Sequence, residues 1–136
     1  MKELKLMARD DTLQTVLSAI EDCLAENGCP MKLVTQILIA AEEIYVNIAH
    51  YAYGGNEGEA RVAMEVTSNP KICRLVFKDK GIPYNPLDKK DPDITLPASE
   101  RPIGGLGIYM VKEMMDSVTY EYKDGQNILT MEKNIQ

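Results

Sequence analysis

Residues 101–112 read RPIGGLGIYMVK, and this stretch decides how the chain is interpreted, because three glycines stand directly before an apolar helical pattern. Gly104, Gly105 and Gly107 allow the backbone to approach an anion closely and to adopt positive φ. The first turn of the following helix offers unpaired N–H groups and the positive end of its dipole. The stretch therefore predicts a phosphate-binding turn, although the same glycines also suit a tight turn that packs a helix on a sheet.

A long loop precedes these glycines. The segment from Pro83 to Pro102 contains five of the seven prolines and has no sustained helix or strand period. Loops longer than roughly 12 to 15 residues are uncommon inside a compact domain and are usually functional lids or disordered segments. We therefore expect a lid hinged on the glycine turn. Because the sequence contains neither GxxxxGK[ST] nor GxGxxG, the class of ligand has to be inferred from other residues.

Composition limits both the architecture and the partners. The chain has 136 residues, 45% of them hydrophobic and 26% charged, so we expect a single domain over residues 1–136. The net charge of −6 disfavours nucleic acid as the main partner. Three cysteines without metal-binding spacing suggest reduced thiols in the cytoplasm. Since no apolar run approaches a membrane span and the N-terminus lacks a signal-peptide core, we expect no membrane association.

Hydrophobic periods predict the order strand, helix, helix, strand, strand, lid, helix, strand, strand. Both predicted hairpins alternate apolar and polar residues, and each helix has one apolar side. The sequence therefore predicts an α+β fold, a two-layer sandwich with helices on one face of a mixed, mostly antiparallel sheet. The expected strands lie near residues 4–8, 60–67, 72–78, 117–122 and 128–132. The expected helices run from residue 11 or 12 to an Asn27-Gly28 end, over 32–53 and over 106–115.

Two polar residues on the second predicted helix suit a metal and proton-transfer site. Glu43 and Asn47 are four residues apart and therefore lie one above the other, beside the apolar stripe of Ile37 and Ile44. An amide oxygen suits Mg²⁺, which prefers oxygen ligands, and a nearby carboxylate can orient or deprotonate an attacking hydroxyl. By spacing alone, an ordinary helix surface is the favoured alternative.

The segment Asp79-Lys80-Gly81-Ile82-Pro83 directly follows a predicted strand. An aspartate at a strand end can accept a hydrogen bond from an exocyclic amine, and a glycine two residues later lets a planar ring approach the backbone. The same letters also form a plain turn sequence. Taken alone, this segment favours the turn.

Three segments in a fixed order favour the functional interpretation over an ordinary helix surface and a plain turn. They are AAEEIYVNIAHYAYGG at residues 40–55, FKDKGIPYNP at 77–86 and ERPIGGLGIYMVKEMMD at 100–116. In this order they resemble the N-box and the two glycine boxes of the Bergerat-fold ATPases, the superfamily of gyrase, Hsp90 chaperones, mismatch-repair ATPases and histidine kinases. Within it, the chain is most similar to the anti-sigma-factor serine kinases of bacterial partner-switching systems. The resemblance runs from about Thr35 to Lys133.

This resemblance implies a Bergerat ATP-binding fold with ATP and Mg²⁺ as cofactors. It implies that Asn47 coordinates the Mg²⁺, that Glu43 is the general base, and that Asp79 binds the adenine amine while Gly81 gives the ring room. The remaining ATP-binding residues that it implies are Gly104, Gly105, Leu106 and Gly107 at the phosphates, Ser99 and Arg101 in the lid, and Thr130 near the adenine.

The resemblance also implies a function. We expect a cytoplasmic, homodimeric protein serine/threonine kinase that phosphorylates a STAS-type anti-sigma-factor antagonist and binds a sigma factor. A nucleotide-gated binding regulator with little or no transfer chemistry remains open as the alternative. A histidine-kinase catalytic domain is disfavoured, because no dimerisation helices with a phosphoacceptor histidine are seen upstream.

The chain departs from the family pattern at one position. Many relatives carry a histidine eight residues after the helix glutamate, where this chain has Tyr51. Its only histidine, His50, stands one position earlier, and we assign it no role.

Overall fold

Five strands and three helices make up the part of the chain that the computed structural model describes, residues 1–88 and 106–136. The strands are β1 (Lys2–Met7), β2 (Glu59–Val66), β3 (Ile72–Asp79), β4 (Ser117–Lys123) and β5 (Gln126–Asn134). The helices are α1 (Leu13–Glu26), α2 (Met31–Asn47) and α3 (Leu106–Met114). Three short helical turns are η1 (Asp10–Thr12), η2 (Ile48–Ala52) and η3 (Pro86–Asp88).

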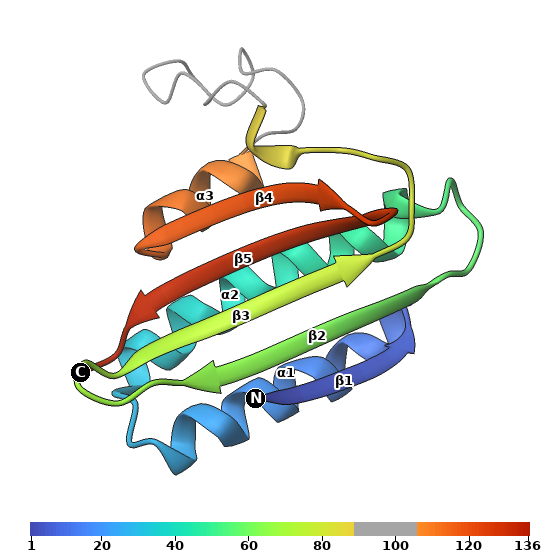
Figure 1. Cartoon of the computed structure of the whole chain (residues 1–136). Helices are drawn as coiled ribbons and strands as arrows, with labels where there is room; N and C mark the ends of the chain where they lie inside the picture. The colour runs from blue at the N-terminus through green and yellow to red at the C-terminus, as the bar shows by residue number, and fades with distance from the viewer. Residues whose placement is uncertain (89–105) are drawn as a thin grey trace.

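The strands form one sheet in the order β1-β2-β3-β5-β4, and the three helices cover one face of it (Figure 1). This arrangement confirms the predicted two-layer α+β fold. The prediction of a mixed sheet needs correction, because every pairing between the described strands is antiparallel. β3 and β4 run parallel to each other, but β5 lies between them and pairs antiparallel with both.

Local sequence explains where the elements end. α1 is followed by Gly28 at φ +68°, a conformation that favours glycine after a helix. The turn between β4 and β5 places Asp124 at φ 53° and Gly125 at φ 75°, as a two-residue hairpin turn requires. The predicted helix end and the predicted hairpin are both confirmed.

The second helix differs from the prediction at its C-terminal end. We expected one helix to residue 53, but α2 ends at Asn47 and continues as η2, a wider π-helical turn. The carbonyl of Ala52, the last residue of η2, accepts a hydrogen bond from the N–H of Ile82 at 2.8 Å. The wider turn therefore joins the end of α2 to the segment after β3, and π-helical turns of this kind are frequent at functional sites.

The core lies between the helices and the inner face of the sheet. Its largest fully buried side chains are Tyr45, Phe77, Ile20, Leu24, Ile37, Met64, Leu75 and Met131. Fully burying one large apolar side chain contributes about 1.5–3 kcal/mol, so these side chains hold the helical layer on the sheet. Cys73 belongs to the same core, and burial raises the pKa of its thiol to about 12. All three cysteines are free thiols, as predicted.

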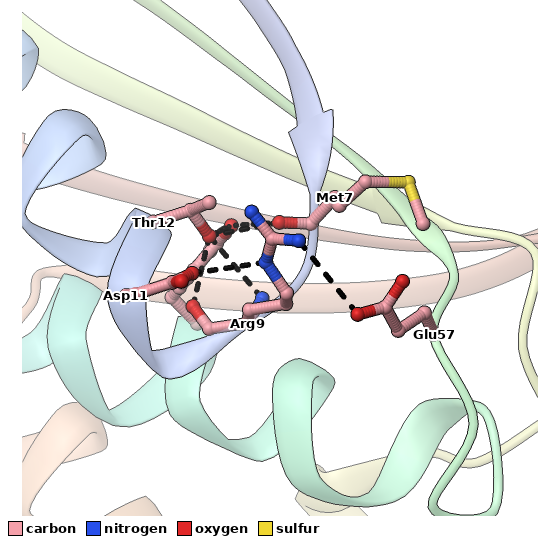
Figure 2. Close-up of polar contacts among 6 residues, drawn as sticks. Met7, Arg9, Asp11, Thr12 and Glu57 are labelled. Atoms are coloured by element: carbon pink, nitrogen blue, oxygen red, sulfur yellow. Dashed lines mark hydrogen bonds and ion pairs between the residues drawn. The ribbon is translucent and has the colours of Figure 1, made fainter.

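A polar cluster fastens the N-terminal segment to α2. Thr12 Oγ1 lies 2.8 Å from the Met7 carbonyl oxygen and 2.6 Å from the hydroxyl of the fully buried Tyr45. Arg9 pairs with Asp11 at 2.9 Å and with Glu57 at 3.7 Å (Figure 2). Exposed ion pairs of this kind contribute little, so the buried Tyr45 hydroxyl is the member of the cluster that matters most for stability. Burial raises its pKa, which keeps it protonated.

Replacing Tyr45 with phenylalanine tests this interpretation. Tyr45→Phe keeps the ring but removes the hydroxyl that contacts Thr12 and donates to the Met7 carbonyl at 3.3 Å. We expect the free energy of unfolding to fall by about 1–2 kcal/mol, as for other buried hydrogen bonds, in urea denaturation. The matched control is Tyr122→Phe at a half-exposed tyrosine, which should change stability by less than about 0.5 kcal/mol. Equal effects at both positions would contradict the assignment.

Candidate functional site

A cavity of about 620 Å³ opens between the C-terminal end of α2, the inner face of the sheet and the start of α3. Its volume lies within the roughly 300–1,000 Å³ typical of small-molecule sites. Its polar lining comes from segments far apart in the chain and includes Glu43, Asn47, Tyr51, Asp79, Tyr84, Tyr120 and Asn127. The structure thus brings together the acidic and amide residues that the sequence singled out.

Glu43 and Asn47 contact each other inside this cavity. Asn47 Nδ2 donates a hydrogen bond to Glu43 Oε1 at 3.2 Å. A carboxylate only accepts hydrogen bonds, so the amide atom facing Glu43 has to be nitrogen, and Asn47 Oδ1 is left for another partner. The pair therefore holds one amide oxygen in a set orientation, which is what a hard metal ion requires of a ligand.

The start of α3 lies against the same pair. Gly107 approaches Glu43 so closely that a Cβ at position 107 would collide with the Glu43 carboxylate. The first turn of α3, from Leu106, carries backbone N–H groups that have no partner within the helix. Glycine at position 107 therefore lets the first turn of α3 lie against Glu43, whereas a side chain there would have to displace the carboxylate.

Asp79 lies at the end of β3 and is only 7% exposed. Its Oδ1 accepts hydrogen bonds from the N–H of Gly81 at 2.8 Å and from Asn127 Nδ2 at 2.9 Å. Among the described residues, both of these donors bond the same oxygen, which leaves Oδ2 as the acceptor that Asp79 can offer to a ligand. A buried carboxylate with one uncommitted oxygen suits a ligand that carries an N–H donor.

The structure adds a packing requirement at Gly81. We expected this glycine to make room for a ring, and a Cβ at position 81 would also collide with the backbone carbonyl of Ala52. Gly81 does not appear among the described residues that line the cavity. Its missing side chain allows the turn after β3 to pack on η2, where the N–H of Ile82 bonds Ala52.

Thr130 also lies elsewhere than expected. On β5 the buried side chains are Asn127, Leu129 and Met131, and the first two line the cavity. Because successive side chains of a strand point to opposite faces, Thr130 points to the open face of the sheet. The residue of β5 that contacts Asp79 is Asn127, which the sequence reasoning missed. The sequence feature that could have found it is the alternation of β5, because Asn127 is a polar residue on the same face as the buried Leu129 and Met131.

Several predicted residues cannot be placed. Ser99, Arg101, Gly104 and Gly105 lie outside the described residues, as does most of the predicted lid. Leu106 is the first residue of α3. Of the two residues at the departure from the family pattern, Tyr51 lines the cavity at 68% exposure, whereas His50 Nε2 lies 2.7 Å from Asp10 Oδ1.

The charge of the cavity fits a nucleotide held with a metal ion. Among the described lining residues, the charged ones are Glu43 and Asp79, and no lysine, arginine or histidine joins them. In the same part of the chain, no group of three or more His, Cys, Asp and Glu side chains has the arrangement of a metal site. Mg²⁺ prefers oxygen ligands and usually keeps several waters together with substrate phosphates, so the Asn47 amide oxygen fits Mg²⁺ that arrives with a phosphate ligand. No described helix is long and apolar enough to span a bilayer.

Comparison with known proteins agrees with this geometry. The family model described as histidine kinase-like ATPase domain matches residues 6–133. Proteins named serine-protein kinase RsbW from Bacillus thuringiensis and Bacillus anthracis are each 25% identical to the chain over 138 aligned positions. These alignments cover 98% of this chain and 84% of each relative.

Solved structures share the fold. The RsbU and RsbW domains of a Mycobacterium tuberculosis protein match with a TM-score of 0.66 at 17% identity, over 99% of this chain. This chain spans only 33% of that solved chain. The histidine kinase domain of a blue-light-activated kinase from Erythrobacter litoralis matches with a TM-score of 0.59 at 15% identity, over 90% of this chain and 59% of the other.

Proposed function

The chain belongs to the histidine kinase-like ATPase domain family, and from this membership we propose that it is a protein serine/threonine kinase that uses Mg-ATP. Its substrate would be a STAS-type antagonist of an anti-sigma factor, and the chain itself would also bind a sigma factor. The similarity to RsbW serine-protein kinases over 98% of this chain supports this proposal. The observation that carries it is the meeting of Glu43, Asn47 and Gly107 with Asp79 around one cavity.

Each residue takes a role that its contacts allow. Asp79 Oδ2 would accept a hydrogen bond from the amine of adenine. Asn47 Oδ1 would coordinate Mg²⁺, because the hydrogen bond from Asn47 Nδ2 to Glu43 leaves this oxygen available. The backbone N–H groups of Leu106 and Gly107 would bind phosphate. Gly104, Gly105, Ser99 and Arg101 keep their predicted phosphate and lid roles as proposals.

Phosphoryl transfer requires few chemical groups from the protein. Bound Mg²⁺ would neutralise phosphate charge, and the remaining work is positioning and proton transfer. Glu43 would accept the proton of a serine hydroxyl as the serine oxygen bonds to the terminal phosphorus and ADP leaves. Because Glu43 also holds Asn47, one side chain would couple proton transfer to the position of the metal ligand.

The proposed partners follow from the same family branch. The net charge of −6 suits a partner with a basic surface better than nucleic acid. We propose that the kinase acts in the cytoplasm as a homodimer, with residues 1–136 as one domain. A nucleotide-gated binding regulator is the second candidate, favoured by Tyr51 at the cavity wall where many relatives carry histidine.

Incubation with labelled ATP separates these candidates. With Mg²⁺ and a STAS-type antagonist, the kinase should transfer label from the terminal phosphate to a serine of the antagonist, detected by gel and by mass spectrometry. Reactions without Mg²⁺ or without antagonist are the controls and should show no labelled antagonist. Tight ATP binding without transfer would support the regulator instead. Absence of ATP binding, measured by calorimetry, would overturn both candidates.

A further inference from the structure

The buried amide of Asn127 connects Asp79 to the segment after β3 and to β4. Asn127 is 8% exposed, and its Nδ2 donates to Asp79 Oδ1 at 2.9 Å and to the Ile82 carbonyl at 3.0 Å. Its Oδ1 accepts hydrogen bonds from the N–H of Tyr84 at 3.1 Å and from the hydroxyl of Tyr120. An amide side chain has two N–H donors and two acceptor lone pairs, so Asn127 is fully used.

These contacts leave the amide only one orientation. The N–H of Tyr84 and the hydroxyl of Tyr120 are donors at this position, so they require an oxygen, which places the nitrogen against Asp79. Burial raises the pKa of Tyr120, and therefore its hydroxyl stays protonated and able to donate. The orientation of Asn127 is thus fixed independently of Asp79.

The orientation of Asp79 follows from that of Asn127. Asp79 Oδ1 accepts one hydrogen bond from Asn127 Nδ2 on β5 and another from the N–H of Gly81 in the turn after β3. These two donors fix the plane of the carboxylate. The other carboxylate oxygen, Oδ2, is then the atom that Asp79 presents to a ligand as a hydrogen-bond acceptor. An acceptor at this point favours adenine, with its amine, and opposes guanine, with a carbonyl oxygen in the same place.

We propose that Asn127 is the positioning residue that sets purine selectivity, because it holds Asp79 Oδ1 and so directs Oδ2 toward an exocyclic amine. This inference rests on the proposed function, in which Asp79 binds the base. Asn127 itself would not touch the nucleotide. Tyr120 supports it from β4, by holding the amide oxygen.

Substituting Asn127 with aspartate gives a signature that simple loss of packing does not give. In Asn127→Asp, two carboxylates would lie at hydrogen-bond distance and could not both be ionised, so the pair acquires one strongly raised pKa. Below that pKa, the shared proton replaces the lost N–H and keeps Asp79 oriented. Above it, the two charges repel and the orientation is lost. ATP affinity should therefore fall as the pH rises, with the other titratable lining groups, Glu43, Tyr51, Tyr84 and Tyr120, unchanged from the parent.

The experiment compares Kd for Mg-ATP and Mg-GTP by calorimetry between pH 5 and 8.5. At pH 8 we expect the preference of Asn127→Asp for ATP to fall at least about 10-fold, and that of Tyr120→Phe about 3- to 10-fold. The matched control is Gln126→Glu, which adds the same charge one residue earlier, on the opposite face of β5. This control should keep the parent's preference at every pH. Circular dichroism melting verifies folding, and Tyr120→Phe decides the question if Asn127→Asp does not fold.

Asp79→Asn separates failure of this inference from failure of the proposed function. If Asp79→Asn lowers the ATP preference while Asn127→Asp and Tyr120→Phe keep the parent's value, the positioning role is wrong and the base site stands. If Asp79→Asn also keeps the parent's preference, Asp79 does not read the base and the proposed function loses its adenine site.

Discussion

Asn47→Ala should abolish the dependence of ATP binding on Mg²⁺. Removing a partner of a metal ligand already costs about 10- to 100-fold in metal affinity, so loss of a direct ligand should weaken Mg-ATP binding by about 100-fold or more. Binding of ATP without Mg²⁺ should change much less, because Asp79 and the first turn of α3 are untouched. Calorimetric titration with ATP, with and without Mg²⁺, measures both values.

The control for this prediction is Asn56→Ala, which removes an exposed amide in the turn before β2. It should titrate like the parent. The thermal midpoint of Asn47→Ala should stay near that of the parent, because Asn47 is only partly buried and, within the described part of the chain, its side chain bonds Glu43 alone. If Asn47→Ala binds Mg-ATP as tightly as the parent, the metal-ligand assignment is wrong.

Glu43→Gln should separate binding from transfer. Glutamine has nearly the same shape, and its oxygen can still accept the hydrogen bond of Asn47, so Mg-ATP affinity should stay within about 3-fold of the parent. The amide cannot accept a proton at neutral pH, and general-base catalysis typically contributes about 10²–10⁴-fold. The rate of phosphoryl transfer to the antagonist should therefore fall by that factor.

Two neighbouring variants sharpen this result. Glu42→Gln removes the same charge from an exposed position beside Glu43 and should leave both binding and transfer unchanged. Glu43→Ala should weaken Mg-ATP binding in addition to slowing transfer, because it releases Asn47 Nδ2. Full transfer activity in Glu43→Gln would exclude Glu43 as the base.

Much of the fold could be predicted because its elements carry local signals. The apolar period of α1, the glycine after it and the Asp124-Gly125 turn are each readable within a few residues. The contact between Glu43 and Asn47 was also predictable, since residues one helical turn apart are neighbours. The ordered motifs also indicated Asp79 and Gly107, and these two residues line the same cavity as Glu43 and Asn47.

The features of the site that sequence reasoning missed depend on tertiary contacts and on strand phase. The steric need for Gly81 comes from Ala52, a residue distant in sequence, so only the tertiary structure reveals it. Thr130 was placed by family position, although the inward phase of Leu129 and Met131 already directs it to the other face. The same phase places Asn127 inward. Asn127, as the polar residue on the inward face of β5, could therefore have been identified from the sequence as a contact of Asp79.

The position of β5 in the sheet bears on how the molecule is synthesised. β5 follows every other described element in sequence, yet it pairs with both β3 and β4. Until it leaves the ribosome, a nascent polypeptide exposes two unpaired strand edges of the kind that invite aggregation. The part of the cavity wall that Asn127 and Leu129 supply therefore forms only after β5 has paired with its two neighbours.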